Sequence, residues 1–160
     1  MNSFAKHILF MFTWAALMGS LAPATLITGF LLGYGVLWLL QPLVGTSDSY
    51  VLRVYYWVKL AVLFLYELVV SSMQVVWDVL TPTHLATPAI IEMPLDVKTD
   101  AGILLVTNLI SLTPGTLSLD VSDDRRTLLV HAMFAEDPDR IREELKSGME
   151  RWVMDAVETP

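Results

Sequence analysis

Four polar side chains lie on one face of a long apolar segment, and their spacing could support chemistry inside a membrane. They are Glu67, Ser71, Gln74 and Asp78. At 100° per residue of helix, they fall within about 60° of one another. A carboxylate near the middle of a membrane helix costs roughly 2.5 to 3.5 kcal/mol, so Glu67 should face protein or water. Two roles fit, a hydrogen bond to a neighbouring helix or a step in a proton or cation path. The first is favoured, because the sequence places no second membrane carboxylate near Glu67.

The remaining polar residues indicate neither an enzyme nor a bound metal or small-molecule cofactor. The chain has no cysteine, and its three histidines are scattered at positions 7, 84 and 131, so a zinc site would have to combine them with carboxylates. His131 is expected to be an ordinary strand histidine, with Asp120 as a candidate neighbour across the hairpin, because no nucleophile motif accompanies it. Phosphate-loop, dinucleotide, HExxH and EF-hand patterns are absent from the sequence.

Composition divides the chain into a neutral apolar half and an acidic tail. Of the 160 residues 54% are hydrophobic, with a mean hydropathy of +0.56, which is too apolar for an ordinary soluble domain. Residues 8–40 contain no Asp, Glu, Lys, Arg or His, and after residue 86 there are 7 basic and 14 acidic residues, which account for the whole net charge of -7. A tail with twice as many acids as bases argues against nucleic-acid binding. The pattern predicts a membrane protein with a soluble tail.

Three membrane helices are predicted, at about 4–18, 24–40 and 54–77. The 33 apolar residues from 8 to 40 are too many for one upright span, and the sequence Gly-Ser-Leu-Ala-Pro at 19–23 predicts a turn between two helices. The third segment has tyrosines and a tryptophan at its start and Trp77 at its end, typical of membrane interfaces. A secretory signal ending at residues 22–24 is a less favoured alternative, because an equally apolar stretch follows at once.

Small side chains at every fourth position predict a packing surface on the second helix. They are Thr25, Gly29 and Gly33. Such a stripe lets another helix backbone approach closely. The neighbour can be the first helix of this chain or a partner subunit.

After a linker at 81–87, residues 88–160 predict a small soluble domain of βαββα, ferredoxin-like order. A strand is expected at 89–97, a helix at 100–112 with an apolar face that includes Leu104, a β-hairpin at 116–132 and a final helix capped by Asp137. The apolar line along the final helix consists of Ile141, Leu145, Met149, Trp152 and Ala156. In the first hairpin strand, Leu117, Leu119 and Val121 should point inward, and Thr116, Ser118 and Asp120 outward.

Residues 107–116, with the sequence TNLISLTPGT, resemble a known family. Together with SSMQVVWDVLTP at 71–82, PAIIEMPLDVKTD at 88–100 and VHAM at 130–133, they resemble the E subunit of multisubunit Na+/H+ antiporters of the Mrp (Mnh, Pha) type. The motif positions are Thr107, Asn108, Leu112, Thr113, Pro114, Gly115 and Thr116. A structural role is favoured for them over ligand contact, because Pro fixes φ, Gly can adopt positive φ and the Thr hydroxyls can satisfy free backbone groups.

The resemblance implies an accessory or structural subunit of a cation/proton antiporter complex in a bacterial cell membrane. Its implied partners are the other subunits and the lipid bilayer, and ion translocation is attributed to larger subunits. It also implies a cytoplasmic tail, whereas counting of positive charges with three crossings places the tail outside. The alternative function is a membrane-anchored interaction module with no transport role.

Overall fold

The computed structural model describes residues 3–44, 50–82 and 85–158. These residues form two compact units, 1–55 and 56–160, and each is described by itself. Residues 83 and 84, which include one histidine, fall in the predicted linker and lie outside the described residues. The boundary at 81–87 stays a prediction about where the membrane part ends.

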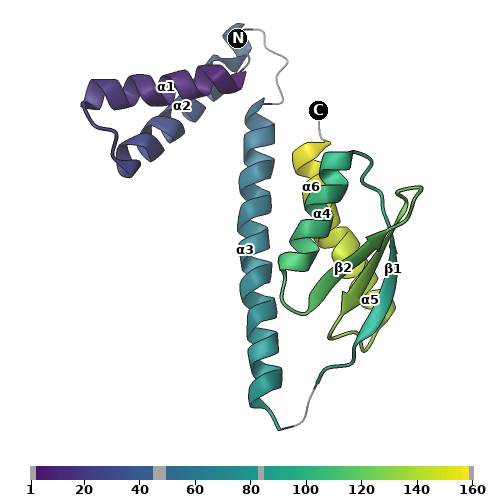
Figure 1. The fold of residues 1–160 in the computed structure, drawn as a ribbon. Helices are drawn as coiled ribbons and strands as arrows, with labels where there is room; N and C mark the ends of the chain where they lie inside the picture. The colour runs from purple at the N-terminus through teal and green to yellow at the C-terminus, as the bar shows by residue number, and fades with distance from the viewer. Residues whose placement is uncertain (1–2, 45–49, 83–84, 159–160) are drawn as a thin grey trace. The chain divides into compact units, whose positions relative to one another are not determined.

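The N-terminal unit is built on a helical hairpin of α1 (Ser3–Met18) and α2 (Pro23–Val44) (Figure 1). The predicted turn at 19–23 is confirmed, since Gly19 adopts a φ of +62° and Pro23 is the first residue of α2. Added Cβ atoms at Gly29 and Gly33 would lie 2.9 Å from the Met11 carbonyl oxygen and from the His7 ring, respectively. The stripe of small residues therefore lies against α1 of the same chain.

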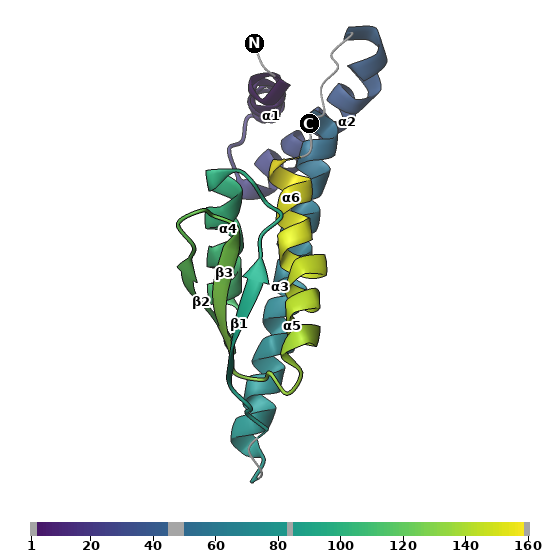
Figure 2. The same cartoon turned by 90° about the vertical axis from the view of Figure 1, so that its right-hand side faces the viewer.

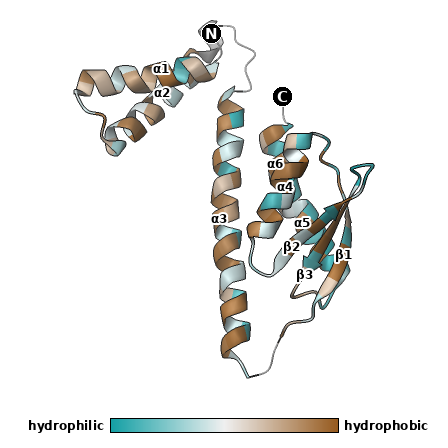
Figure 3. Ribbon diagram, viewed as in Figure 1, coloured by the Kyte–Doolittle hydropathy of each residue, from teal (hydrophilic) through white to brown (hydrophobic). Residues whose placement is uncertain are grey.

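Helix α3 (Tyr50–Leu80) is the longest element, with 31 residues or about 46 Å. Hydrophobic residues dominate its length (Figure 3). Among the described residues, two helices are long and apolar enough to cross a membrane, Pro23–Leu40 within α2 and the whole of α3. Helix α1, with 16 residues or about 24 Å, is shorter than a hydrocarbon layer of roughly 30 Å. Two spans are therefore supported by length, where three were predicted.

The C-terminal domain contains a three-stranded antiparallel sheet with helices on one face (Figures 1 and 2). The strand order is β1-β3-β2, so the two strands that flank α4 in the sequence are separated by β3. The elements are β1 (Ala89–Pro94), α4 (Asp100–Leu112), β2 (Thr116–Val121), β3 (Thr127–Ala132), α5 (Pro138–Leu145), a π-helical segment (Lys146–Glu150) and α6 (Arg151–Val157). The predicted order βαββα is the observed one, although β1 ends at Pro94 rather than at residue 97.

The core of the domain lies between the sheet and the helices. Its fully buried side chains include Met93 on β1, Val106 and Ile110 on α4, and Leu128 and Val130 on β3. Leu60 on α3 is 4% exposed and belongs to the same cluster. Leu145, Met149 and Ala156 contribute the predicted apolar line of the last helix, whereas Trp152 only packs on the border of the core.

Strand β2 overturns the predicted alternation. Leu117 and Leu119 are 47% and 46% exposed, and Thr116 and Ser118 point inward instead. A β-bulge between Ser118 and Asp120 shifts the register, so only the last predicted inward residue, at position 121, is partly buried. The physical reason is that both inward hydroxyls donate hydrogen bonds to α4 carbonyls, at Ile110 and at residue 107. These bonds offset the free-energy cost of removing the hydroxyls from water.

Two further expectations about side chains in the domain are wrong. Leu104, predicted on the apolar face of α4, is 63% exposed. His131 lies opposite Leu117, and Asp120 lies opposite Leu129, so the histidine and this aspartate are not cross-strand neighbours.

Candidate functional site

Helix α3 directs its polar face toward the rest of its own unit. Ser71 and Asp78 are 7% and 3% exposed, although the opposite side of α3 is widely exposed. The Ser71 hydroxyl donates to the carbonyl of Glu67 at 2.7 Å, and Asp78 accepts the backbone N–H of Leu85. Gln74 is exposed at the border of this face. Two of the four polar side chains, Ser71 and Asp78, therefore already form hydrogen bonds with backbone groups of this chain.

The segment at 112–116 ends α4 and turns the chain into β2. Leu112 is the last residue of α4, and the Thr113 hydroxyl donates to the carbonyl of Leu109 at 2.9 Å. Thr116 Oγ1 donates to the carbonyls of Ile110 and Thr113, at 2.6 and 3.1 Å. The last carbonyls of a helix have no partner within the helix, so these hydroxyls satisfy groups that would otherwise be unpaired.

The neighbouring motif positions make local bonds of the same kind. Gly115 has a φ of +90°, and its carbonyl accepts the N–H of Met133 at 2.7 Å, which ties the turn following Pro114 to the segment after β3. Upstream, Thr107 and Asn108 both donate to the carbonyl of residue 104. These contacts are those of a helix end and a chain turn.

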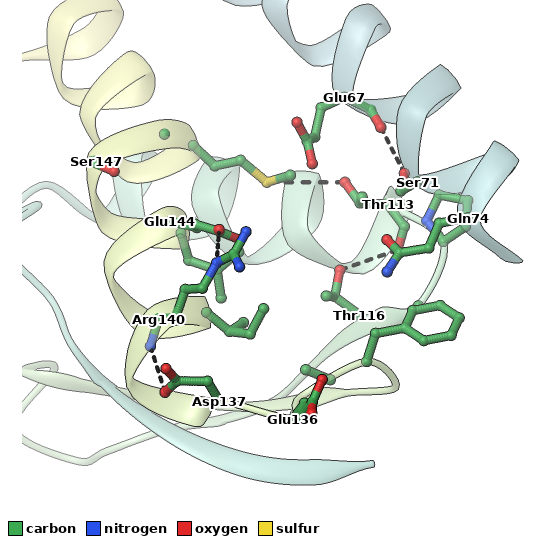
Figure 4. Close-up of a pocket in the computed structure, with 18 of the residues that line it drawn as sticks. Glu67, Ser71, Gln74, Thr113, Thr116, Glu136, Asp137, Arg140, Glu144 and Ser147 are labelled. Atoms are coloured by element: carbon green, nitrogen blue, oxygen red, sulfur yellow. Dashed lines mark hydrogen bonds and ion pairs between the residues drawn. The ribbon is translucent and has the colours of Figure 1, made fainter. Parts of the chain in front are cut away.

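Two predicted groups line one cavity. The α3 residues Glu67, Ser71 and Gln74 and the segment 113–116 face a hollow of about 970 Å³. Figure 4 shows Glu67 and Thr113 on the side of the hollow away from Arg140 and Asp137. Both groups were identified from the sequence, but nothing in the sequence indicated that they meet.

The cavity is acidic. Its lining carries four acidic side chains and one basic one, Glu67, Glu136, Asp137, Glu144 and Arg140. Arg140 Nε donates to Glu144 at 2.7 Å, and this hydrogen bond with the nearby negative charge raises the pKa of Arg140. The guanidinium is thus engaged by a carboxylate of its own helix. Among its described residues, this lining therefore has no unpaired basic side chain that could bind an anionic ligand.

Among the described residues, no group of three or more His, Asp or Glu side chains is arranged to hold a metal ion. Arg140 is the one basic residue in the described cavity lining, and it lies away from Glu67 and is paired with Glu144 (Figure 4).

Glu150 is a buried charged side chain that the sequence did not reveal. It is 1% exposed and accepts the backbone N–H groups of Asp96 and Val97 at 2.6 and 3.1 Å, while Lys146 Nζ lies 3.7 Å away. The π-helical segment places this carboxylate toward the β1–α4 connection, one residue after buried Met149. An acid beside the apolar line of an amphipathic helix was the available signal.

His7 is the second buried polar residue that was missed. Its exposure is 0%, its Nε2 lies 2.7 Å from the carbonyl oxygen of Phe30, and its Nδ1 lies 2.7 Å from the Tyr50 hydroxyl. A carbonyl only accepts hydrogen bonds, so Nε2 must carry a proton, and in the neutral ring Nδ1 accepts from the tyrosine. The histidine thereby links α1, α2 and the first residue of α3 within the N-terminal unit.

Apolar helices of span length joined to a small α+β domain are typical of a subunit of a membrane assembly. The family model described as "Na+/H+ ion antiporter subunit" (MnhE) matches residues 7–156. The chain belongs to this family. It is the E subunit of an Mrp-type Na+/H+ antiporter complex, a part of a transporter and not an enzyme.

Relatives match over nearly their full length. The E1 subunit of the Na(+)/H(+) antiporter of Staphylococcus haemolyticus is 35% identical over 147 residues, which are 92% of this chain and 92% of that protein. The corresponding E subunit of Alkalihalophilus pseudofirmus is 31% identical over 144 residues, 90% of each chain. The Bacillus subtilis protein of the same name is 31% identical over 149 residues, 93% of this chain and 94% of that protein.

One solved structure agrees with this assignment, and a second shares the fold. A chain of the Mrp complex from Dietzia sp. DQ12-45-1b is 26% identical, with a TM-score of 0.50, and the match covers 66% of this chain and 96% of that one. A chain of the membrane-bound sulfane sulfur reductase, an archaeal respiratory membrane complex, covers 98% of both chains at 24% identity with a TM-score of 0.53, a likeness of fold alone.

Proposed function

We propose that this chain is an accessory subunit that supports assembly of the antiporter and contributes no ion-translocating group of its own. The observation behind the proposal is how the polar residues of α3 are used. Ser71 and Asp78 bond to backbone of the same chain, which leaves Glu67 as the single charged side chain between Lys59 and Asp78. A relay through a membrane needs successive ionisable groups or waters, and one isolated carboxylate does not provide them.

Reconstitution tests this role directly. The purified chain alone in liposomes should show no Na+/H+ exchange above that of empty liposomes, and exchange would refute the accessory role. In cells, Glu67→Gln keeps shape and hydrogen bonding but removes titration, so antiport should be near normal. Glu67→Leu places an apolar side chain in the acidic cavity and should lower recovery of the complex. A Gln variant that assembles normally but loses antiport would place Glu67 on the ion path.

The membrane arrangement is part of the proposal. Three crossings within residues 1–80, a linker and a soluble ferredoxin-like domain at 88–160 fit the composition, and the strand order β1-β3-β2 supports the ferredoxin-like description. We place the tail on the cytoplasmic side. With three crossings, a cytoplasmic tail requires the N-terminus outside. With crossings by α2 and α3 alone, since α1 is too short to span upright, both chain ends lie on the cytoplasmic side.

A second arrangement of α3 is favoured by its contacts within the C-terminal unit. Leu60 is buried in the core of the domain, and Lys59 Nζ lies 3.8 Å from Asp155, which also pairs with Arg151 at 3.2 Å. Lipid cannot surround a helix that holds these charged neighbours. In this arrangement α3 lies along the membrane surface, with its exposed apolar side toward lipid and its polar side on the domain.

Cysteine labelling separates the two arrangements, because the chain has no native cysteine. Single cysteines at Trp57, Val69, Leu80 and Ser122 would be probed with an impermeant maleimide in intact cells and in inverted vesicles. A crossing α3 exposes positions 57 and 80 on opposite sides and protects position 69. A surface α3 exposes both ends on the side of position 122. Labelling of position 122 in intact cells would contradict a cytoplasmic tail.

A further inference from the structure

The outer face of the sheet is apolar where a soluble domain is normally polar. Leu117 and Leu119 point away from the helices, and the inward positions of the same strand are taken by Thr116 and Ser118. An antiparallel sheet with one face toward solvent ordinarily shows the reverse pattern. Burial within the C-terminal unit does not explain the outward leucines, since neither contributes to the core of that unit.

The outward leucines are part of a larger patch. Ile90 on β1 lies opposite His131 on β3, which lies opposite Leu117 on β2, so the three form one row across the sheet. Leu129 lies two residues before His131 on the same face, and Ile90 is 62% exposed. We call Ile90, Leu117, Leu119 and Leu129 the outer patch. Figures 1 and 2 show the described helices of the domain on the other face only.

Both edges of the sheet are closed to an added strand. On β1, Arg142 Nε and Lys146 Nζ donate to the carbonyls of Glu92 and Pro94, each at 2.8 Å. On β2, the N–H of Ser118 donates to the hydroxyl of α4 residue 111 at 3.1 Å, and the bulge interrupts the strand. Occupied edge groups and bulges prevent edge-to-edge pairing. A partner must therefore bind the face.

The border of the outer patch is acidic. Glu92 and Asp120 lie on either side of Leu129 in the sheet, and the three strands, residues 89–94, 116–121 and 127–132, contain no Lys or Arg. A second copy would bring like charges together, and an anionic bilayer surface would be repelled in the same way. The complementary partner is an apolar surface bordered by Lys or Arg.

We propose that the outer patch docks onto such a surface of a neighbouring subunit of the antiporter complex. The inference rests on the membership of this chain in that complex and adds where one contact lies. The contact lies on the outer face of the sheet, separate from α3 and from the cavity. Clusters of apolar side chains on an otherwise polar surface are typical of protein contact sites.

Photo-crosslinking identifies the occupant. A benzophenone amino acid replaces Leu117 in the full chain, which is expressed with the other subunits in cells that lack their own antiporter. Leu104 on α4, 63% exposed but outside the outer patch, is the matched control position. We expect position 117, and not position 104, to form an adduct with another subunit. Adducts with a second copy, with lipid only or with nothing would overturn the proposal.

Substitution gives an independent measurement. The double variant Leu117→Thr and Leu119→Thr keeps residues that favour strands, so the domain should fold, and it should lower recovery of partner subunits about tenfold. Leu104→Gln should leave recovery unchanged. Unchanged recovery with the double threonine variant would contradict docking at this face. If the unaltered chain fails to purify with any antiporter subunit, the complex itself is refuted, whereas purification without an adduct at 117 refutes only the docking site.

Discussion

The N-terminal unit buries a histidine that is hydrogen-bonded to a tyrosine, whereas the C-terminal domain buries a carboxylate. In the hairpin, His7 joins the Phe30 carbonyl and the Tyr50 hydroxyl across three helices, whose backbone groups are already satisfied by helix formation. In the domain, the irregular connection from β1 to α4 leaves N–H groups without partners, and Glu150 accepts two of them. Buried polarity therefore links whole helices in the first unit and completes a loop in the second.

The largest expected effect comes from removing the buried carboxylate. Glu150→Leu leaves the N–H groups of Asp96 and Val97 unpaired and Lys146 without one of its two acidic neighbours, so the free energy of unfolding should fall by about 3 to 5 kcal/mol. Urea unfolding of the full chain in detergent, followed by tryptophan fluorescence, measures this. The exposed Glu143 provides the control, and a Glu143→Leu change of equal size would remove the contrast with Glu150.

The hairpin should be less sensitive to loss of its buried polar residue. His7→Leu removes one hydrogen bond to a hydroxyl and one to a helix carbonyl, so we expect a loss of about 1 to 3 kcal/mol. Tyr50→Phe should reproduce part of this loss, because it deletes only the hydroxyl partner. The midpoint of thermal unfolding in detergent reports both variants. A His7 variant as damaging as Glu150→Leu would end the distinction between the two units.

Close helix approach in the N-terminal unit can be tested with two glycines of α2. A Cβ at Gly29 would stand 2.9 Å from the Met11 carbonyl oxygen, whereas a Cβ at Gly35 meets nothing within 4 Å. Gly29→Ala should therefore destabilise the hairpin by about 1 to 3 kcal/mol. Gly35→Ala should be neutral or stabilising by up to about 1 kcal/mol. Thermal unfolding in detergent compares the two, and equal effects would mean that the stripe is not a contact between α1 and α2.

The smallest effect concerns a second, more exposed carboxylate and depends on pH. Burial alone would raise the pKa of Glu158, but hydrogen bonds from the Thr99 and Lys98 backbone outweigh it, so the pKa lies below its ordinary value of 4.5. A lowered folded pKa gives stability that is complete above the ordinary pKa and is lost as pH falls through the folded value. Glu158→Gln should cost less than about 1 kcal/mol at pH 7, and the difference from the unaltered chain should vanish in acid. Urea unfolding at a series of pH values checks this, and a difference that grows in acid would reverse the sign of this linkage.

The sequence predicted elements well where local chemistry determines them. Asp137 caps α5 with Pro138 in its first turn, as expected from residue type alone, and Thr99 caps α4 by accepting the N–H of Gly102. The prediction of inward and outward residues failed in β2. Leu117 and Leu119 alternate as a strand requires, but this alternation does not indicate which face of the sheet the helices cover. In that strand, the β-bulge and the α4 carbonyls decide the orientation, and both depend on tertiary contacts.

The candidate site was predictable in its parts and not in its assembly. Periodicity placed Glu67, Ser71 and Gln74 on one face, and the turn chemistry of Pro114 and Gly115 followed from residue type. That both groups line one cavity depends on how α3 packs on its unit, for which a 31-residue helix gives no local signal. Glu150 was missed because a π-helical turn breaks the 3.6-residue period used to assign faces.

That π-helical turn has a consequence for comparing chains by alignment. It amounts to one residue inserted into a helix, so a relative without it would carry a one-residue gap between Lys146 and Glu150. The π-helical turn accommodates that extra residue locally, so Val153 in the core and Glu158 beside Thr99 occupy the same helix faces as their counterparts in such a relative. Deletion of a single residue within this segment, with the turn reverting to α-helix, therefore keeps the inward face. A deletion in a regular part of the helix would instead turn every later residue by about 100°.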